Sequence, residues 1–269
     1  MQPLSDFPKD TLKNIRFILT DIDDTLTENG RLPAKSYQAL ERLKQAGLKV
    51  IPITGRPAGW CDQIARLWPV DGVVGENGAF YFIYNSTLRK MRQRYWKNEN
   101  ERAADRKELE QLRKIILDEV EGSSVASDQA FREADLAIDF CEDIPALSQS
   151  AIDQIVNIFE QAGAIAKVSS IHVNGWFGNY DKLSMTRILF AECFQTDMDL
   201  AQDQIVFCGD SPNDEPMFGF FENSVGVANV LDFVDTMEQQ PCWITKNRTA
   251  SGFVELSEVI LNARSATSI

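Results

Sequence analysis

The sequence predicts an α/β fold in which a doubly wound parallel sheet is interrupted by an inserted α+β unit. At both ends of the chain, short apolar runs alternate with single amphipathic helical patterns, an order typical of parallel strands. A central block of roughly 90 residues breaks this alternation and is large enough to hold a small core of its own. Two apolar strands far apart in the sequence also end in carboxylates, at the strand ends where such sheets bind ligands.

The first third of the chain supplies the first three predicted strands. They lie at residues 15–20, 48–53 and 72–74, and a helix over residues 34–46 separates the first two. A second helix is expected to begin at Pro57, because proline suits the first turn of a helix. Its apolar side chains recur at helical spacing, at Cys61, Ile64, Ala65 and Trp68. This order of elements predicts neighbouring parallel strands.

The central block predicts a mixed unit. The expected elements are a strand leaving the sheet at 79–84, a helix within 89–121, a strand at 136–140, a helix ending at Gly163, and strands at 164–169 and 170–174. We therefore expect residues 86–176 to form the insertion, and residues 1–85 and 177–269 to form the core.

The last third returns to alternation. A helix is expected over residues 182–194, followed by strands at 204–208, 225–228 and 242–245 and a closing helix over 251–263. The strand at 204–208 ends shortly before an acidic turn, as the strand at 15–20 does. The two turns should meet if these strands are neighbours.

Composition excludes several classes of protein. The net charge of −13 argues against non-specific binding to nucleic acid or to an anionic membrane surface. The N-terminus lacks an apolar signal segment, and no stretch reaches the roughly 20 apolar residues of a membrane span. A single histidine, His172, rules out histidine triads and multi-histidine metal sites. Five widely spaced cysteines favour free thiols, so we expect a cytoplasmic protein.

The segment DIDDT concentrates three carboxylates, on Asp21, Asp23 and Asp24. Alternate residues of an extended segment point the same way, so Asp21 and Asp23 can address one centre. Two carboxylates this close raise each other's pKa unless a cation lies between them. Mg²⁺ is commonly held by one or two carboxylates and a substrate phosphate. The alternative is a turn with a solvated acidic face.

The segment GDSPND is the second acidic turn. Asp210 and Asp214 are one helical turn apart if Asp214 opens a helix, so both could face one site. The alternative is an ordinary turn in which Asp214 caps a helix. Two such segments at the ends of two strands are less easily explained by chance than either one alone.

Two further positions suit phosphate binding. Thr54, Gly55 and Arg56 follow the strand at 48–53, and a hydroxyl with free backbone N–H groups at a helix start binds phosphate well. Lys182 opens the helix at 182–194, where the helix dipole disfavours a positive charge. The alternatives are a simple helix cap at Thr54 and a solvated lysine paired with Asp181.

Together these segments resemble a known family. DIDDT, ITGR, the DK before a helix, and GDSPND, in that order, resemble the four motifs of the haloacid dehalogenase-like (HAD) phosphohydrolases. The insertion resembles the larger α/β cap of the subgroup with Cof-type sugar phosphatases, sucrose-phosphate phosphatase, mannosyl-3-phosphoglycerate phosphatase and phosphomannomutase. GENGA at 75–79 resembles that subgroup as well. The resemblance implies a Rossmann-like core with an inserted cap. Asp24 and Leu183 depart from it, since many relatives have glycine there.

The resemblance also implies a role for each matching residue. Asp21 would be the nucleophile that forms an aspartyl-phosphate, and Asp23 the general acid and base. Mg²⁺ would be held by Asp21, the backbone carbonyl of Asp23, Asp210 and Asp214. The phosphoryl group would be bound by Thr54, Gly55, Lys182 and Asn213. Arg56 and Asn77 are also expected to contact substrate. The place of His172 and Asn174, just before the chain returns to the core, rather than the resemblance, predicts that they contact substrate. The alternative is that His172 is an ordinary half-buried residue of a strand.

The function implied is that of a Mg²⁺-dependent phosphatase. It would hydrolyse a small phosphorylated metabolite, and a sugar phosphate is expected. One alternative is a phosphohexomutase that uses the same aspartyl-phosphate, and another is a non-catalytic relative that only binds a metabolite. The sequence leaves the substrate and the oligomeric state open.

Overall fold

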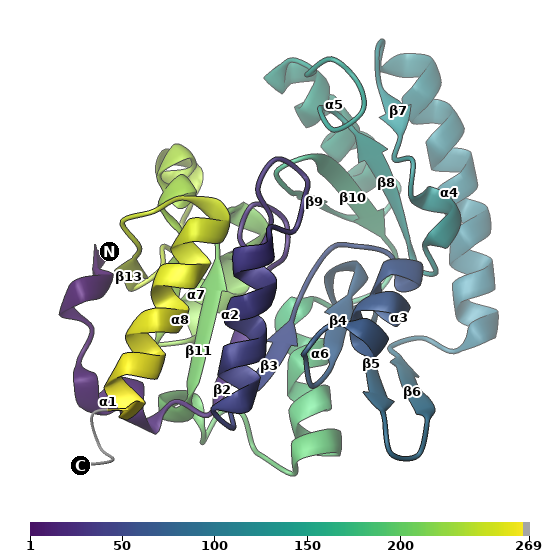
Figure 1. The fold of residues 1–269 in the computed structure, drawn as a ribbon. Coiled ribbons are helices and arrows are strands. Elements are labelled where there is room, and N and C mark those ends of the chain that lie inside the picture. The colour runs from purple at the N-terminus through teal and green to yellow at the C-terminus, as the bar shows by residue number, and fades with distance from the viewer. Residues whose placement is uncertain (266–269) are drawn as a thin grey trace.

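The computed structural model describes residues 1–265 and contains a main sheet of six parallel strands (Figure 1). The strand order is β1-β13-β12-β11-β2-β3. The strands are β1 (Gln2–Pro3), β2 (Phe17–Thr20), β3 (Lys49–Pro52), β11 (Ile205–Gly209), β12 (Ser224–Gly226) and β13 (Trp243–Ile244). This arrangement confirms the predicted parallel sheet. It also places β11 directly beside β2, with Cys208 opposite Thr20.

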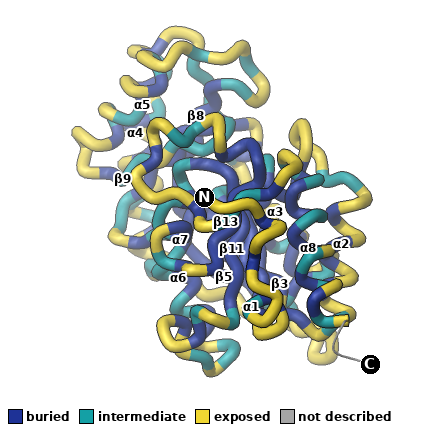
Figure 2. Tube along the Cα trace, turned by 90° about the vertical axis from the view of Figure 1, so that its left-hand side faces the viewer, coloured by how far each residue is buried: buried dark blue, intermediate teal, exposed yellow. Residues whose placement is uncertain are grey.

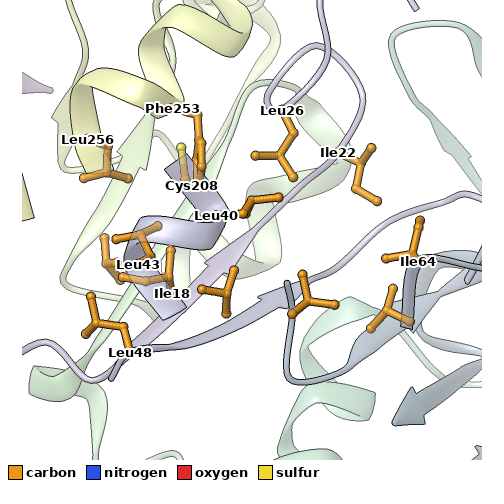
Figure 3. Close-up of a cluster of buried hydrophobic side chains, with 14 of the residues drawn as sticks. Ile18, Ile22, Leu26, Leu40, Leu43, Leu48, Ile64, Cys208, Phe253 and Leu256 are labelled. Carbon is orange, nitrogen blue, oxygen red and sulfur yellow. The ribbon is translucent and has the colours of Figure 1, made fainter. Parts of the chain in front are cut away.

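Helices cover both faces of the main sheet. α2 (Ala34–Gln45) and α8 (Thr249–Ser265) pack side by side on one face, and α1 (Lys9–Asn14) and α3 (Ala58–Leu67) join them. α6 (Lys182–Leu189) and α7 (Glu215–Phe220) cover the other face. Figure 3 shows the first face, where Ile18 meets side chains of α2 and α8. Phe17 and Leu19 point to the opposite face, as alternation along a strand requires.

The helix that begins at Lys182 ends earlier than expected. α6 stops at Leu189, and the chain continues through Phe194 as a π-helical turn rather than as the α-helix expected to residue 194. No helix within residues 1–265 is long and apolar enough to cross a membrane. In Figure 2 the central strands form a buried layer, while exposed residues gather on outer loops and helices.

A second, antiparallel sheet extends the main one. β4 (Val73–Gly75), β5 (Phe80–Asn85) and β6 (Lys90–Tyr95) form it, and a parallel bridge between Ile53 and Val74 connects it to the main sheet. The sequence prediction of a helix within residues 89–121 missed β6. The charged run KMRQRY hides a two-residue period, because Met91 and Tyr95 pack against the core while Arg92 and Arg94 face outward.

The inserted cap contains its own sheet, here called the cap sheet. Its order is β7-β8-β10-β9, from β7 (Ser124–Val125), β8 (Asp135–Asp139), β9 (Ile165–Val168) and β10 (His172–Trp176). α4 (Glu99–Glu119) and α5 (Gln149–Gln161) cover one face and enclose a separate apolar cluster. β10 lies two residues later than predicted. The division into a core and a cap at residues 86 and 176 stays a proposal.

The other face of the cap sheet is polar. Alternate residues of β10 share one side, and these are His172, Asn174 and Trp176. His172 and Asn174 line a cavity together with residues of the core, including Asp21. The polar face of the cap sheet therefore lies over the strand ends of the main sheet.

A buried glutamate ties the start of the cap sheet to the core. Glu76 accepts hydrogen bonds from the backbone N–H of Ala58 at 2.9 Å, of Glu133 at 2.9 Å and of Ala134 at 2.6 Å. Ala58 begins α3, whereas Glu133 and Ala134 lead into β8. One carboxylate thus satisfies N–H groups of both units at once.

Candidate active site

The two acidic turns meet at the carboxyl ends of β2 and β11. Asp21 directly follows β2, Asp210 directly follows β11, and the Asp21 N–H donates to the Cys208 carbonyl at 2.8 Å. Adjacent parallel strands end at the same edge of a sheet, so their next residues lie close together. The structure therefore brings together the segments that the sequence singled out.

Three buried carboxylates form the centre of this site. Carboxylate oxygens of Asp21, Asp210 and Asp214 lie within 4.8 Å of one another. Lys182 Nζ donates to Asp21 and to Asp214, at 2.7 Å each. Burial and the neighbouring carboxylates raise the pKa of Asp21 to about 8 and raise that of Asp210 well above its usual range. One ammonium does not balance three carboxylates here.

This cluster suits a hard divalent cation. It offers carboxylate oxygens, which Mg²⁺ prefers, and it carries a charge that a bound cation would neutralise. Burial opposes the charge of Lys182, yet Asp21 and Asp214 still raise its pKa. The lysine therefore stays charged beside them. Asp21, Asp210 and Asp214 are the residues that fit such an ion.

Neighbouring groups fix the positions of Asp210 and Asp214. The Asp210 N–H donates to Asp214 Oδ2 at 3.0 Å, and a methyl group at Gly209 would collide with that carboxylate. Asn229 Nδ2 donates to Asp210 Oδ2 at 2.9 Å and to the Asp24 carbonyl at 3.1 Å. Sequence reasoning missed Asn229. Its position in the sequence could have indicated it, because it follows β12, a third parallel strand that ends at the same edge of the main sheet.

Asp23 turns toward Arg56. Arg56 Nε donates to both Asp23 oxygens at 3.0 Å, and Nη2 donates to Oδ1 at 2.9 Å. The same guanidinium reaches two cap carboxylates, Glu142 at 2.9 Å and Asp128 at 3.4 Å. It is 4% exposed. Arg56, expected to contact substrate, here joins the proposed general acid to the cap.

Of the residues expected at the phosphoryl group, Lys182 contacts Asp21, and Gly55 and Asn213 line the same cavity as Asp21. Thr54 is buried, and its Oγ1 accepts from the Arg56 N–H at 3.0 Å. Gly55 lines the cavity above Asp21. Asn77 has a φ of 53° and donates its N–H to the Thr54 carbonyl at 3.1 Å. Its side chain packs so closely on Gly55 that a methyl group there would lie 3.3 Å from the amide.

Asn213 and the cap close the cavity. Asn213 accepts from Ser211 Oγ at 3.0 Å, and His172 Nε2 lies 2.8 Å from Glu142 Oε2. Asn174 donates to Asp135 at 3.0 Å. The cavity holds only about 10 Å³, roughly the room for one water, and its lining includes Asp21, Asp23, Arg56, His172, Asn174 and Asn213. The cap is therefore in a closed position.

Several cap residues of the site carried no sequence signal. Arg132 is buried and donates to Asp128 at 3.0 Å, to Asp135 at 3.0 Å and to the Gly55 carbonyl at 3.0 Å. Glu142 follows β8, and three backbone N–H groups bound to Asp139 shape its loop. The two ion pairs of Arg132 lie within the cap, and its hydrogen bond to the Gly55 carbonyl joins the cap to the core.

The ion pairs of Glu142 predict a pH-dependent contribution to stability. His172 and Arg56 lower the pKa of Glu142 to about 2, below its ordinary value near 4.5. Because the pKa is lower in the folded state, ionised Glu142 stabilises the fold at pH values above its pKa in the unfolded state. This contribution is lost as the pH falls from about 4.5 to about 2. We expect Glu142→Gln to lower the melting temperature at pH 6.5. The difference in melting temperature between this variant and wild type should be smaller at pH 3. Thermal melting at both values checks this, and an equal difference would contradict it.

Comparison with known proteins identifies the fold. Residues 18–255 match the family of haloacid dehalogenase-like hydrolases. No curated protein matches the sequence. A Thermoplasma acidophilum structure is 18% identical, with a TM-score of 0.70 over 92% of this chain and 98% of that one. The sucrose-phosphatase of Synechocystis is 16% identical, with a TM-score of 0.61 over 92% and 98%.

A structure described as a HAD subclass IIB sugar phosphatase is 12% identical, with a TM-score of 0.61 over 90% of this chain and 98% of that one. At these identities the three structures show a shared fold, with its parallel core and its cap. The family match covers most of the sequence, including the acidic turns after β2 and β11. The chain therefore belongs to the haloacid dehalogenase-like hydrolases.

Proposed function

We propose that this protein is a Mg²⁺-dependent phosphatase that hydrolyses a small phosphorylated metabolite through an aspartyl-phosphate on Asp21. One observation carries the proposal: Asp21, Asp210 and Asp214 form a buried acidic cluster, and Lys182 contacts two of them. Phosphoryl transfer to a carboxylate requires a nucleophilic carboxylate and positive charges beside it, which a lysine and a bound cation can supply. The presence of all these carboxylates together with Lys182 argues against a relative that only binds a metabolite.

The substrate proposed is a sugar phosphate. Two structures of the same fold are described as a sucrose-phosphatase and a sugar phosphatase, which supports placing this chain in the Cof-type and sucrose-phosphate phosphatase-like subgroup. The polar face of the cap sheet also supports this choice, because hydroxyl groups need hydrogen-bonding partners. Residues 86–176 would then select the substrate.

The chain's own residues account for the first step. Asp21 attacks phosphorus, and the bond from phosphorus to the ester oxygen breaks. The Thr54 hydroxyl, the Gly55 N–H and Lys182 hold the phosphoryl oxygens, and bound Mg²⁺ would reduce the repulsion between two anions. Asp23 enters this step protonated and gives its proton to the departing alcohol oxygen, for which its carboxyl group must turn away from the Arg56 guanidinium that holds it here.

The second step restores the enzyme. Asp23, now ionised, takes a proton from a water molecule, whose oxygen attacks phosphorus. The bond from phosphorus to Asp21 breaks and inorganic phosphate leaves.

A metabolite screen tests the proposed function. Purified protein is incubated with a panel of sugar phosphates and other phosphomonoesters, with Mg²⁺ or with EDTA, and released phosphate is measured. We expect Mg²⁺-dependent release from at least one sugar phosphate. Conversion of a hexose 1-phosphate to the 6-phosphate without phosphate release would support the mutase instead. If neither reaction occurs with any compound of the panel, the non-catalytic alternative is supported.

Replacement of Asp23 should separate proton transfer from nucleophilic attack. We expect Asp23→Asn to lower kcat/KM, which reports the step in which the alcohol leaves, about a hundredfold to ten-thousandfold for a sugar phosphate, since the alcohol must leave unprotonated. The loss should be smaller for para-nitrophenyl phosphate, because nitrophenolate leaves readily without a proton. Steady-state kinetics on both substrates measures this difference. Equal losses on the two would contradict a general-acid role.

A further inference from the structure

Asp210 differs from the other two carboxylates of the buried cluster in its partners. Asp21 and Asp214 each form an ion pair with Lys182, whereas no lysine or arginine within residues 1–265 forms one with Asp210. Its two oxygens accept hydrogen bonds from neutral groups instead. Thr25 Oγ1 donates to Oδ1 at 3.3 Å, and Asn229 Nδ2 donates to Oδ2 at 2.9 Å. Asp210 is 1% exposed, so its negative charge is left for a bound cation to balance.

The amide of Asn229 also holds the turn that follows β2. Its Nδ2 donates to the Asp24 carbonyl at 3.1 Å as well as to Asp210. An amide NH₂ carries two hydrogens and can therefore serve both acceptors. Asp24 directly follows Asp23, whose backbone carbonyl is expected to bind the cation. One side chain thus connects the two turns that would supply the ligands.

The start of α8 fixes the orientation of this amide. The Thr249 N–H donates to Asn229 Oδ1 at 2.9 Å. The backbone on either side is tied down as well, since the Ala228 N–H donates to the Asn247 carbonyl at 3.1 Å. Because an N–H group occupies Oδ1, the donor end of the amide must face Asp210 and Asp24. Asn229 is 6% exposed, so little water competes for these contacts.

We propose that Asn229 is a positioning residue that sets the affinity of the acidic cluster for its divalent cation. It would act by holding Asp210 and the turn at Asp24 in one relative position before the ion binds. Mg²⁺ demands near-ideal octahedral geometry, so it gains from ligands that are already in place. A neutral donor suits this role, because a cationic one would repel the ion. The inference rests on the proposed function and deepens it by naming a residue outside the ligand set.

Asn223 offers a matched control for replacing Asn229. It lies just before β12, whereas Asn229 lies just after it, and both side chains are 6% exposed. Asn223 Nδ2 also donates two hydrogen bonds, to the carbonyls of Gln202 and Ile205. Asn223→Ala and Asn229→Ala therefore remove the same amide from equally buried positions. Only the second change removes a contact with the acidic cluster.

Mg²⁺ affinity of the full chain provides the test. The melting temperature is measured as a function of Mg²⁺ concentration, and electron paramagnetic resonance of free Mn²⁺ measures binding directly. We expect Asn229→Ala to bind both ions about 10-fold to 100-fold more weakly than wild type, as when a group that orients a metal ligand is lost. Asn223→Ala should lower the melting temperature in EDTA and keep the wild-type affinity.

Steady-state kinetics separates positioning from a general loss of structure. For Asn229→Ala, the Mg²⁺ concentration that gives half the maximal rate with para-nitrophenyl phosphate should rise by the same factor as the dissociation constant. At saturating Mg²⁺, kcat should stay close to that of wild type. If Asn229→Ala does not fold, Asn229→Ser decides, because its hydroxyl is one bond shorter than the amide and cannot span both acceptors.

The outcomes distinguish this inference from the proposed function. Unchanged Mg²⁺ affinity in a folded Asn229 variant, with an active wild type, overturns the inference alone. An equal loss of affinity in Asn223→Ala also overturns it, since affinity would then follow overall stability. If wild type binds Mg²⁺ but releases no phosphate from any phosphomonoester, the proposed function fails, and the titrations still decide the role of Asn229. A wild type that binds neither ion overturns both.

Discussion

Replacing Asp21 with asparagine is expected to lower kcat for phosphate release at least about a thousandfold. The amide cannot form the acyl-phosphate bond, so the covalent route is lost. Its oxygen can still accept from Lys182 Nζ, which lies 2.7 Å from Asp21 Oδ1, so the fold should survive. Release of para-nitrophenol at saturating substrate and Mg²⁺ measures the rate, and circular dichroism confirms the fold.

Asp24→Asn is the matched control for this substitution. It makes the same chemical change three residues away in the same loop. Asp24 has a φ of 52°, a left-handed conformation that asparagine tolerates well. Its carbonyl, not its side chain, receives the hydrogen bond from Asn229. We expect a rate close to wild type. A folded Asp21→Asn protein as active as this control would exclude Asp21 as the nucleophile.

Replacing Lys182 with methionine should impair both activity and stability. We expect kcat to fall about a hundredfold or more, because phosphoryl charge loses a buried partner. Without a divalent cation, the free energy of unfolding should fall by about 3–5 kcal/mol, as when one partner of a buried ion pair is removed. Both ion pairs of Lys182 are almost fully buried, so solvent screens them little. Urea unfolding in EDTA measures this loss.

Mg²⁺ should restore part of the stability of Lys182→Met. A cation held by Asp21, Asp210 and Asp214 would replace the missing positive charge, and binding to the folded state alone raises its stability. Lys107→Met, on an exposed position of α4, should unfold like wild type in either buffer. Equal unfolding of Lys182→Met and Lys107→Met in EDTA would show that the lysine does not compensate the cluster.

The core and its acidic centre were predictable because their signals are local. Apolar runs ending at Thr20 and Cys208 predict strands, and parallel neighbours bring their ends to one edge. The positions of Asp21 and Asp210 then follow from the topology. Strand β6 was missed because its charged residues conceal a two-residue period in a run that also suits a helix.

The contacts between cap and core were not predictable in the same way. Arg56 meets Asp128 and Glu142, which lie 72 and 86 positions further along the chain. No local pattern specifies which of 40 acidic residues will reach a given arginine. The place of His172 and Asn174 just before the chain returns to the core was the basis for expecting them at the site. Their partners Glu142 and Asp135 became apparent only once the cap sheet was placed over the site.

The hydrogen bonds of Glu76 would form the hinge if the cap rotates relative to the core. Glu76 holds Glu133 and Ala134 to the first turn of α3, while Glu142 lies beyond the far end of β8, whose five residues span about 16 Å. If the cap rotates about this point, Ala134 moves least and Glu142 moves most. The ion pair between Arg56 and Glu142 would then break before the hydrogen bonds of Glu76. A small rotation of the cap about Glu133 and Ala134 would thus open a wide gap above Asp21.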